Sequence, residues 1–211
     1  MKPYQVPDDE YLPRLREGHI PYVNDPEPWR AVRWGSEELQ SARLEVMARI
    51  VKRACQYERV LDVGCGLGEL AMWLGNYSCL GPYRGIDLVE ELITEAKTRF
   101  DGRKYRFETH DLRDEPRPAD AVIASGIFAL CNDRIFWSML DAMWESAEVV
   151  MAFNCKSSWA PENSKYLGKT AYFRDPAETL AQCRTRYTRN LILDHSYLDH
   201  DFTIGMHKGG K

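Results

Sequence analysis

Short apolar segments alternate with helical periodicity through the middle of the chain. Five mostly apolar segments bounded by polar or glycine positions are typical of buried strands, at 59–63, 83–87, 105–109, 119–125 and 148–153. Apolar residues at helical spacing lie between them, at 69–74, 89–100 and 134–146. Strands that alternate with helices in this way predict a parallel sheet covered by helices on both faces.

The first part of the chain departs from this alternation. Residues 1–35 hold six prolines together with several tyrosines and tryptophans. Prolines at this density disfavour a long helix, while the aromatic rings favour burial, so we expect an arm or lid that lies on the domain surface. Helical spacing starts after Ser36, which fits an N-cap, and ends near Arg53. We therefore expect the main domain to span residues 36–211.

The C-terminal part predicts an antiparallel hairpin. A helix begins at Pro176, after an Asp175 cap, and continues to about Thr185. Two strands follow at 191–195 and 202–207, and their link is too short for the crossover that parallel neighbours need. The predicted fold is therefore α/β, with a mostly parallel seven-stranded sheet, a C-terminal antiparallel hairpin and helices on both faces.

Composition narrows the class of protein. A chain of 211 residues is one ordinary domain with a short extension. No run approaches the ~20 apolar residues of a membrane span, and the first residues lack the apolar core of a secretory signal. The formal net charge of −4 disfavours a general electrostatic grip on nucleic acid. We therefore predict a cytoplasmic protein with a small-molecule partner, no membrane contact and no nucleic-acid contact.

The cysteines and histidines give no sign of a metal centre. The six cysteines are scattered singly, without a C-x-x-C pair and without clustering with the five histidines. This pattern favours reduced thiols and predicts no metal site.

The segment at 60–70, VLDVGCGLGEL, carries the clearest chemical signal. A predicted strand enters it and a helix leaves it, so three glycines allow a tight turn whose backbone can approach a ligand at a helix N-terminus. The dinucleotide spacing G-x-G-x-x-G is absent, because Glu69 stands where its last glycine would fall. No Gly-Lys-Ser/Thr follows either. A nicotinamide or flavin cofactor is therefore disfavoured, and a P-loop is excluded.

Two acidic residues stand at the ends of the next strands. Asp87 ends the second strand, where a carboxylate can accept hydrogen bonds from both hydroxyls of a ribose. It also fits a cap for the following helix, and both roles can hold together. Asp111 follows the third strand, where it can accept the exocyclic amine of an adenine or stand as an ordinary loop carboxylate. Together these residues predict an adenosine site without a phosphate clamp.

At these residues the sequence resembles the class I S-adenosylmethionine-dependent methyltransferases. The likeness is carried by D-V-G-C-G-L-G at 62–68, G-I-D at 85–87, H-D-L at 110–112 and the terminal hairpin, and it covers residues 36–208. Shorter stretches are similar to a subgroup of small stand-alone members whose substrates are mostly unassigned: ASGIFAL at 124–130, AFN at 152–154, YFRDPAE at 172–178 and DHSYLDHDFT at 194–203. The resemblance implies a Rossmann-like fold and S-adenosylmethionine as cofactor.

The resemblance also implies roles for particular residues. The glycine loop is expected to hold the methionine moiety, Asp87 the ribose and Asp111 the adenine, while the end of the fourth strand faces the sulfonium. The expected cofactor contacts are Trp34, Gln40, Arg43, Gly64, Cys65, Gly66, Asp87, Leu88, His110, Asp111, Leu112, Ser125 and Gly126. The guanidinium of Arg43 suits the methionine carboxylate, unless it lies on a solvated helix face.

Three residues are expected to be catalytic: Asn154, Tyr172 and His195. Asn154 and Tyr172 would form part of the active-site wall, or else be a loop amide and a core aromatic. His195 is a candidate general base, as are His110 and His200, although a lone histidine is more often hydrogen-bonded scaffold.

Three functions remain open at this level. The first is methyl transfer to a small molecule of secondary metabolism by a monomer or homodimer. The fourth strand is followed by Ser125-Gly126-Ile127-Phe128 instead of the Asn/Asp-Pro-Pro-Tyr/Phe of nucleic-acid amine methyltransferases. The second is a methyltransferase-like cyclase that converts S-adenosylmethionine to azetidine-2-carboxylate and methylthioadenosine, since only the aromatic arm and residues 156–170 can build an acceptor pocket. The third is a module that binds the cofactor without turnover.

Overall fold

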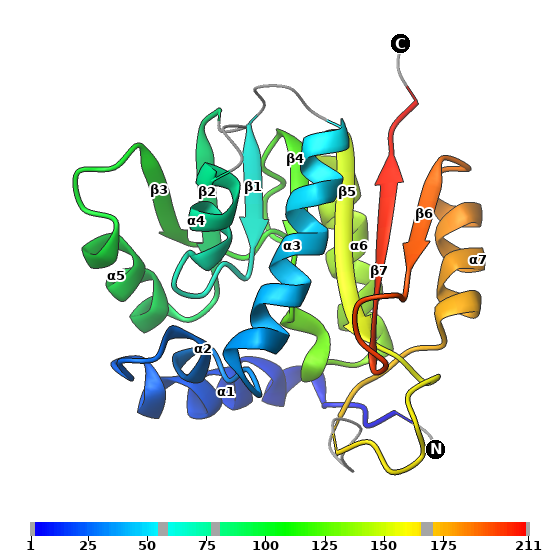
Figure 1. Ribbon diagram of the computed structural model, residues 1–211, viewed down its shortest axis with the longest axis horizontal. Helices are drawn as coiled ribbons and strands as arrows, with labels where there is room; N and C mark the ends of the chain where they lie inside the picture. Colours follow the sequence, from blue (N-terminus) through cyan, green and yellow to red (C-terminus); the bar gives the residue numbers. More distant parts are fainter. Residues whose placement is uncertain (1–2, 55–58, 77–80, 166–170, 210–211) are drawn as a thin grey trace.

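The computed structural model describes residues 3–54, 59–76, 81–165 and 171–209. Its centre is a seven-stranded sheet in the order β3-β2-β1-β4-β5-β7-β6 (Figure 1). The strands are β1 (Val60–Val63), β2 (Tyr83–Asp87), β3 (Tyr105–Thr109), β4 (Ala119–Ala124), β5 (Ala147–Lys156), β6 (Leu191–Asp194) and β7 (Asp201–His207). Neighbours from β3 to β5 are parallel, whereas β7 is antiparallel to both β5 and β6. The predicted fold class and C-terminal hairpin are confirmed.

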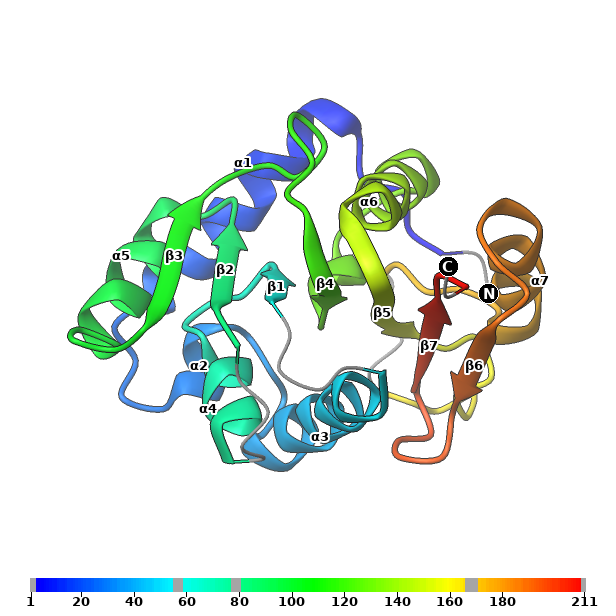
Figure 2. The same cartoon turned by 90° about the horizontal axis from the view of Figure 1, so that it is seen from above.

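Helices cover both faces of the sheet (Figure 2). On one face lie α3 (Glu37–Ala54), α4 (Glu69–Asn76) and α5 (Glu90–Arg99), and on the other lie α6 (Asp133–Ser146) and α7 (Pro176–Arg186). Each face has its own apolar core, one built around Met47, Leu74 and Ile93 and the other around Phe136, Leu140 and Phe153. Strands buried on both sides explain why the segments at 60–63 and 119–124 read as nearly continuous apolar runs.

The helix starts follow the sequence signals. The hydroxyl of Ser36 accepts a hydrogen bond from the Leu39 N–H at 3.3 Å, and the Asp175 carboxylate accepts one from the Glu178 N–H at 2.8 Å. Both predicted caps are confirmed. The sequence reading did not name the cap of α6, where the Asn132 side chain accepts from the Ile135 N–H at 2.8 Å. Side-chain oxygens satisfy orphan N–H donors at these helix starts.

The N-terminal arm is more helical than its prolines predict. It forms α1 (Asp8–His19), the short 3-10 turn Ile20–Tyr22 and α2 (Pro28–Ala31). The expectation of no long helix was wrong for residues 8–19. Pro13 lies inside α1, where it removes one helical hydrogen bond, but the first turn is acidic and the Tyr11 side chain is buried against the domain. Tertiary packing of one aromatic face outweighs the proline.

The strand order places a crevice at one edge of the sheet. β1 pairs with β2 on one side and with β4 on the other. The chain therefore builds the sheet outward from β1 in one direction through β2 and β3, and then in the other direction through β4 and β5. Val63 is level with both Ile86 and Ala124, which brings the segments after these three strands to the same height. The carboxyl ends of the parallel strands point toward α1 and α2 (Figure 1). Open α/β sheets bind ligands at such a switch point.

Candidate functional site

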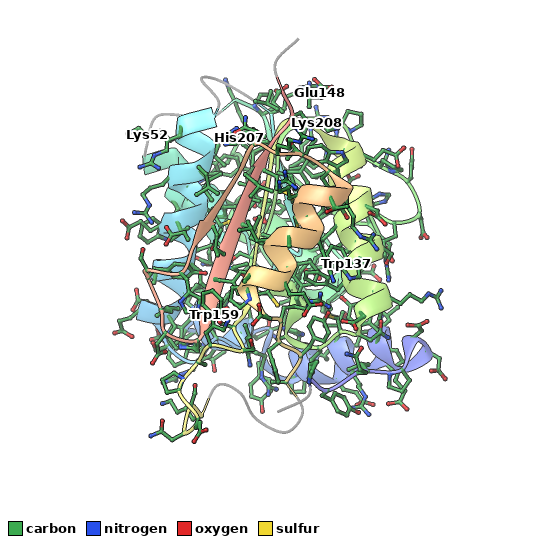
Figure 3. The ribbon with its side chains drawn as sticks, turned by 90° about the vertical axis from the view of Figure 1, so that its right-hand side faces the viewer. Lys52, Trp137, Glu148, Trp159, His207 and Lys208 are labelled. Atoms are coloured by element: carbon green, nitrogen blue, oxygen red, sulfur yellow. The ribbon has the colours of Figure 1, made fainter. Side chains whose placement is uncertain are left out.

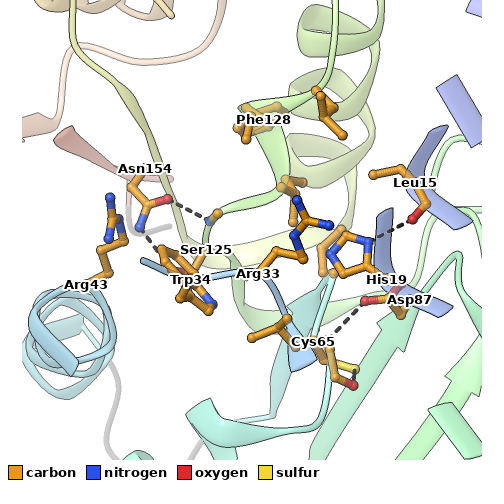
Figure 4. Close-up of a pocket in the computed structure, with 18 of the residues that line it drawn as sticks. Leu15, His19, Arg33, Trp34, Arg43, Cys65, Asp87, Ser125, Phe128 and Asn154 are labelled. Atoms are coloured by element: carbon orange, nitrogen blue, oxygen red, sulfur yellow. Dashed lines mark hydrogen bonds between the residues drawn. The ribbon is translucent and has the colours of Figure 1, made fainter. Parts of the chain in front are cut away.

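A cavity of about 530 Å³ occupies this crevice. Its walls come from the loops after β1, β2, β3, β4 and β5, from the start of α3 and from the arm. Figure 4 shows its two ends, with Asp87 and His19 at one and Asn154 and Arg43 at the other. The volume falls within the ordinary range for small-molecule sites.

The glycine loop forms the floor between β1 and α4. The N–H groups of Gly64 and Cys65 donate to the Ile86 carbonyl at 2.8 and 3.0 Å, which ties the loop to β2. Gly64, Gly66 and Gly68 have φ of 70°, 53° and 83°, a region that favours glycine. A Cβ on Gly64 would lie 2.2 Å from the Ile127 side chain. The loop therefore admits a backbone conformation and a close approach that other residues would prevent.

Asp87 lies beside this loop, and its carboxylate accepts hydrogen bonds from two backbone N–H groups. One carboxylate oxygen accepts a hydrogen bond from the Gly66 N–H at 3.0 Å (Figure 4). The other accepts from the Val89 N–H at 2.9 Å, just before α5. Burial raises the pKa of Asp87, while these backbone hydrogen bonds act in the opposite direction. The side chain thus orders the glycine loop and the helix entry while it lines the cavity.

The segment after β3 holds three of the predicted cofactor contacts, and two of them line the cavity. His110 and Leu112 line the cavity together with Leu88, but Asp111 is not among the described lining residues. Its carboxylate instead accepts hydrogen bonds from the Arg113 guanidinium at 2.6 to 3.2 Å. Burial alone would raise the pKa of Asp111, yet the Arg113 hydrogen bonds and charge outweigh it and lower the pKa. In the structure an ion pair with Arg113 within the same segment satisfies Asp111, and its contact with an adenine stays a prediction.

Ser125, Gly126 and Asn154 form one hydrogen-bonded group at the ends of β4 and β5. The buried Asn154 amide accepts from the Gly126 N–H at 2.8 Å and donates to the Ser125 hydroxyl at 3.0 Å (Figure 4). Gly126 has φ 80°, and a Cβ there would lie 2.5 Å from the Trp34 ring. Asn154 therefore shapes the turn after β4, and Trp34 closes over it.

Trp34, Gln40 and Arg43 all line the cavity, and their contact with a cofactor stays a prediction. The Arg43 side chain is buried and forms an ion pair with Asp201 of β7. Its guanidinium lies 4.5 Å from the centre of the Trp34 ring and donates to the Leu39 carbonyl at 2.9 Å. The solvated-face alternative for Arg43 is therefore wrong, because a residue from the far hairpin covers it.

Two predicted catalytic residues do not reach the described cavity lining. Tyr172 is buried in the core, and its hydroxyl donates to Asp133 at 2.7 Å. His195 shares a hydrogen bond with the Ser157 hydroxyl at 2.7 Å and packs against Trp159, whose exposed ring lies at the sheet edge (Figure 3). Core packing and a local polar pair account for these side chains, which fits the core-aromatic and scaffold alternatives, and the catalytic roles of both residues stay predictions. Of the three, only Asn154 lines the cavity.

Several lining residues escaped the sequence analysis. The arm contributes Tyr11, Leu15, His19 and Arg33, which could be placed only once α1 was known to cross the crevice. Asp62 belongs to the quoted loop motif but was given no role. It is buried, accepts from the Tyr83 hydroxyl at 2.6 Å, and burial raises its pKa to about 7. An acidic residue within a strand otherwise buried on all sides was the signal available for it.

The described residues hold neither a group of three metal-ligating side chains nor a helix long and apolar enough to cross a membrane. The four described cysteines, Cys65, Cys131, Cys155 and Cys183, are free thiols, and Cys55 and Cys79 lie outside the described residues.

Comparisons with known proteins converge on one kind of domain. Residues 60–151 match a family model described as a methyltransferase domain. The chain is 30% identical over 167 residues to "Putative methyltransferase Rv1506c" of Mycobacterium tuberculosis, covering 76% of this chain and 98% of that protein.

Solved structures share the fold at lower sequence identity. One is magnesium protoporphyrin IX methyltransferase from Synechocystis PCC 6803 with bound SAM, with a TM-score of 0.68, 17% identity and coverage of 97% of this chain and 99% of that one. Another is the N-methyltransferase NodS from Bradyrhizobium japonicum in complex with S-adenosyl-L-homocysteine, with a TM-score of 0.67, 14% identity and coverage of 92% and 98%.

Proposed function

Because this chain belongs to the class I S-adenosylmethionine-dependent methyltransferases, we propose that it transfers the methyl group of S-adenosylmethionine to a small-molecule acceptor in the cavity described above. The observation that carries the proposal is the joint position of the glycine loop and Asp87 at the switch point of the sheet. Main-chain amides there can approach a ligand closely, and a carboxylate stands beside them to accept its hydroxyl donors.

The residues at this end fit S-adenosylmethionine. Gly64, Cys65 and Gly66 line the cavity, so their backbone can contact the methionine moiety, while positive φ and the close approach of Ile127 and Val32 exclude larger side chains at the two glycines. Each oxygen of Asp87 can accept more than one hydrogen bond, so it can bind ribose hydroxyls and keep its bonds to Gly66 and Val89. Leu88, His110 and Leu112 then border the adenine, and Asp111 acts on it only through the segment that it braces with Arg113.

The glycine loop follows the central strand β1, and the segments after β4 and β5, on its other side from Asp87, fit the reacting centre. When bound, S-adenosylmethionine supplies a methyl carbon on a positively charged sulfur, which an acceptor lone pair attacks while the sulfur keeps the electron pair of the bond that breaks. Asn154 holds the turn of Ser125 and Gly126 in place through two hydrogen bonds, so this wall is preorganised. The Trp34 ring lies directly over Gly126 and presents an aromatic surface there.

The N-terminal arm acts as the lid of the site in this proposal. It supplies Tyr11, Leu15 and Val32 to the cavity wall, and the Arg16 guanidinium pairs with Glu91 of α5 at 2.7 Å. An arm held across the crevice excludes water from a reactive sulfonium. Residues 3–35 and the main domain would then form one site together.

A small-molecule acceptor is supported by the enclosure of the cavity between the arm and the sheet. Its 530 Å³ suit a cofactor and a compact acceptor better than a polymer segment. A role in secondary metabolism, a cytoplasmic location and a monomeric or homodimeric state stay predictions.

Product analysis tests the proposal. Purified protein is incubated with S-adenosylmethionine, with and without a library of small acceptors, and the products are identified by mass spectrometry. We expect S-adenosylhomocysteine that depends on an acceptor. Methylthioadenosine formed without any acceptor would instead identify a cyclase. Tight cofactor binding with no turnover above background across a broad library would favour a binding module, and either result would overturn the proposal.

A further inference from the structure

The end of the cavity beyond Asn154 contains the charged side chain of Lys156, to which the proposed cofactor contacts assign no role. This inference rests on the proposed function, because it concerns the acceptor of the same site. The sheet order places β3 and β5 on opposite sides of β1, so the segments after β2 and β3 and those after β4 and β5 form separate ends of the crevice. The first end fits adenosine, which leaves the second for the sulfonium and the acceptor.

Lys156 is the last residue of β5 and lines this second end. It is half-buried and lies two residues beyond Asn154 on the same strand, a rise of about 7 Å along the strand axis. From this position the lysine side chain can reach a molecule that is held against Ser125, Gly126 and Asn154. The position is therefore close to the expected acceptor and remote from the Asp87 end.

A cluster of ionisable groups surrounds Lys156. In the register of β5 and β7 it faces Asp201, whose carboxylate pairs with Arg43 of α3. Burial, followed by the charge of Arg43, lowers the pKa of Lys156. Burial also lowers the pKa of His200, which precedes Asp201 in the chain, and the His200 Nδ1 is 2.7 Å from the outward-facing Asp199.

Positive charge exceeds negative charge at this end. Its described charged lining residues are Arg43, Lys156, Lys165 and Asp201, and only the last is acidic. S-adenosylmethionine would add a sulfonium, an ammonium and one carboxylate, which increases the positive excess by one. In a partly enclosed cavity like charges repel more strongly than in water, so an anion bound here would be stabilised.

The remaining walls of this end are apolar. The segment after β4 contributes Phe128, Ala129 and Leu130. Ala171 lines the cavity next to this segment, because the following Tyr172 N–H donates to the Ala129 carbonyl at 3.2 Å. Apolar walls with one convergent charge are the usual arrangement for a small amphipathic ligand. We propose that the methyl acceptor is a small organic acid whose carboxylate is bound by Lys156 while its apolar body packs against the segment after β4.

Binding to the protein loaded with S-adenosylhomocysteine tests this without any turnover. The probes are a panel of small aromatic and aliphatic carboxylic acids, each paired with its primary amide, and affinity is measured by calorimetry. The test variant is Lys156→Met, which keeps an unbranched side chain one atom shorter and removes its charge. The matched control is Lys52→Met, in the last turn of α3 at the end of the molecule away from α1 (Figure 3).

We expect at least one acid to bind tenfold or more tightly than its amide, and Lys156→Met to remove that preference. Affinity for S-adenosylhomocysteine should change less than twofold in this variant, and Lys52→Met should match the unmodified protein in both measurements. Acids and amides that bind alike would overturn the inference. So would a Lys156→Met variant that loses cofactor affinity instead, because Lys156 would then hold the methionine carboxylate. Failure of the proposed function would appear separately, as absent turnover in the unmodified protein.

Discussion

At the β1–β2 end of the cavity, Asp62 and Asp87 accept hydrogen bonds from Tyr83 and from backbone N–H groups, whereas at the β5 end Asp201 pairs directly with Arg43. Burial raises the pKa of both carboxylates at the first end. Carboxylates that are stabilised mainly by neutral donors can still accept hydrogen bonds from the hydroxyl groups of a ligand. A carboxylate matched by a guanidinium chiefly holds elements together, here α3 and the C-terminal hairpin.

This difference separates binding from stability. Changes at the first end should alter cofactor affinity or the pH dependence of folding, while changes in the buried pair at the second should lower the free energy of unfolding. The predictions that follow test this separation, beginning with the largest effect.

Removal of Arg43 should be severely destabilising. In Arg43→Met the buried carboxylate of Asp201 loses its cation, and breaking a buried pair from one side costs about 3–5 kcal/mol. The free energy of unfolding, measured by urea denaturation at pH 7, should fall by that amount. Part of the loss should return in Arg43→Met/Asp201→Asn, which leaves no isolated charge.

A second arginine of α3 supplies the control. Arg49 pairs with Asp194 of β6 at 3.2 Å, but its side chain is 45% exposed, so Arg49→Met should cost less than about 1 kcal/mol. Both arginines join the same helix to the same hairpin, but the Arg43 pair is buried and the Arg49 pair is exposed. Equal losses in Arg43→Met and Arg49→Met would contradict the assignment of the buried pair as a structural element.

Asp62 should make folding stability depend on pH near neutrality. Its pKa is about 7 in the folded protein and near 3.8 in the unfolded chain, because burial disfavours the charged form. The unfolded chain therefore loses this proton first, and stability falls as pH rises from about 4 to about 7. Between pH 5 and pH 8 the contribution is about 2–3 kcal/mol.

The variant Asp62→Asn isolates this contribution. An asparagine oxygen can still accept from the Tyr83 hydroxyl, but it has no proton to lose. Unfolding free energies measured at pH 5 and pH 8 should therefore differ less in the variant than in the unmodified protein. Identical pH profiles for the two proteins would mean that Asp62 ionises at its ordinary pKa.

The same contrast explains what the sequence could predict. The β1–β2 end depends on residues close to one another along the chain: three glycines in one turn and an acid at the end of the next strand. Strand periodicity was enough to place Asp87 beside that turn. The β5 end depends on Arg43 meeting Asp201, which are brought together only when the last strand inserts next to β5. No local pattern encodes that pairing.

Side-chain direction was harder to predict than backbone position. Asp111 and His195 were placed by the sheet edge and Tyr172 by the resemblance, but in the structure their side chains contact Arg113, Ser157 and Asp133, respectively. Backbone position follows from strand order, whereas side-chain direction depends on which partner is nearest. The helix α1 was missed because Tyr11 gains its burial from tertiary contact.

The smallest expected effect is a change in cofactor affinity, and it differs between Asp87, at the end of β2, and Asp111, after β3. In Asp87→Ala the cofactor loses a ribose acceptor and the glycine loop loses its hydrogen bond at Gly66, so affinity for S-adenosylmethionine should fall at least tenfold, equivalent to about 1.4 kcal/mol. In Asp111→Ala only the brace to Arg113 is lost, and affinity should change by no more than about twofold. Calorimetric titration of both variants measures this, with circular dichroism as the check on folding.

If Asp111→Ala lost as much affinity as Asp87→Ala, Asp111 would contact the adenine after all, and Arg113 would have to release it when the cofactor binds. If neither variant lost affinity, hydrogen bonds from the loop backbone would account for cofactor binding at this end without help from a carboxylate.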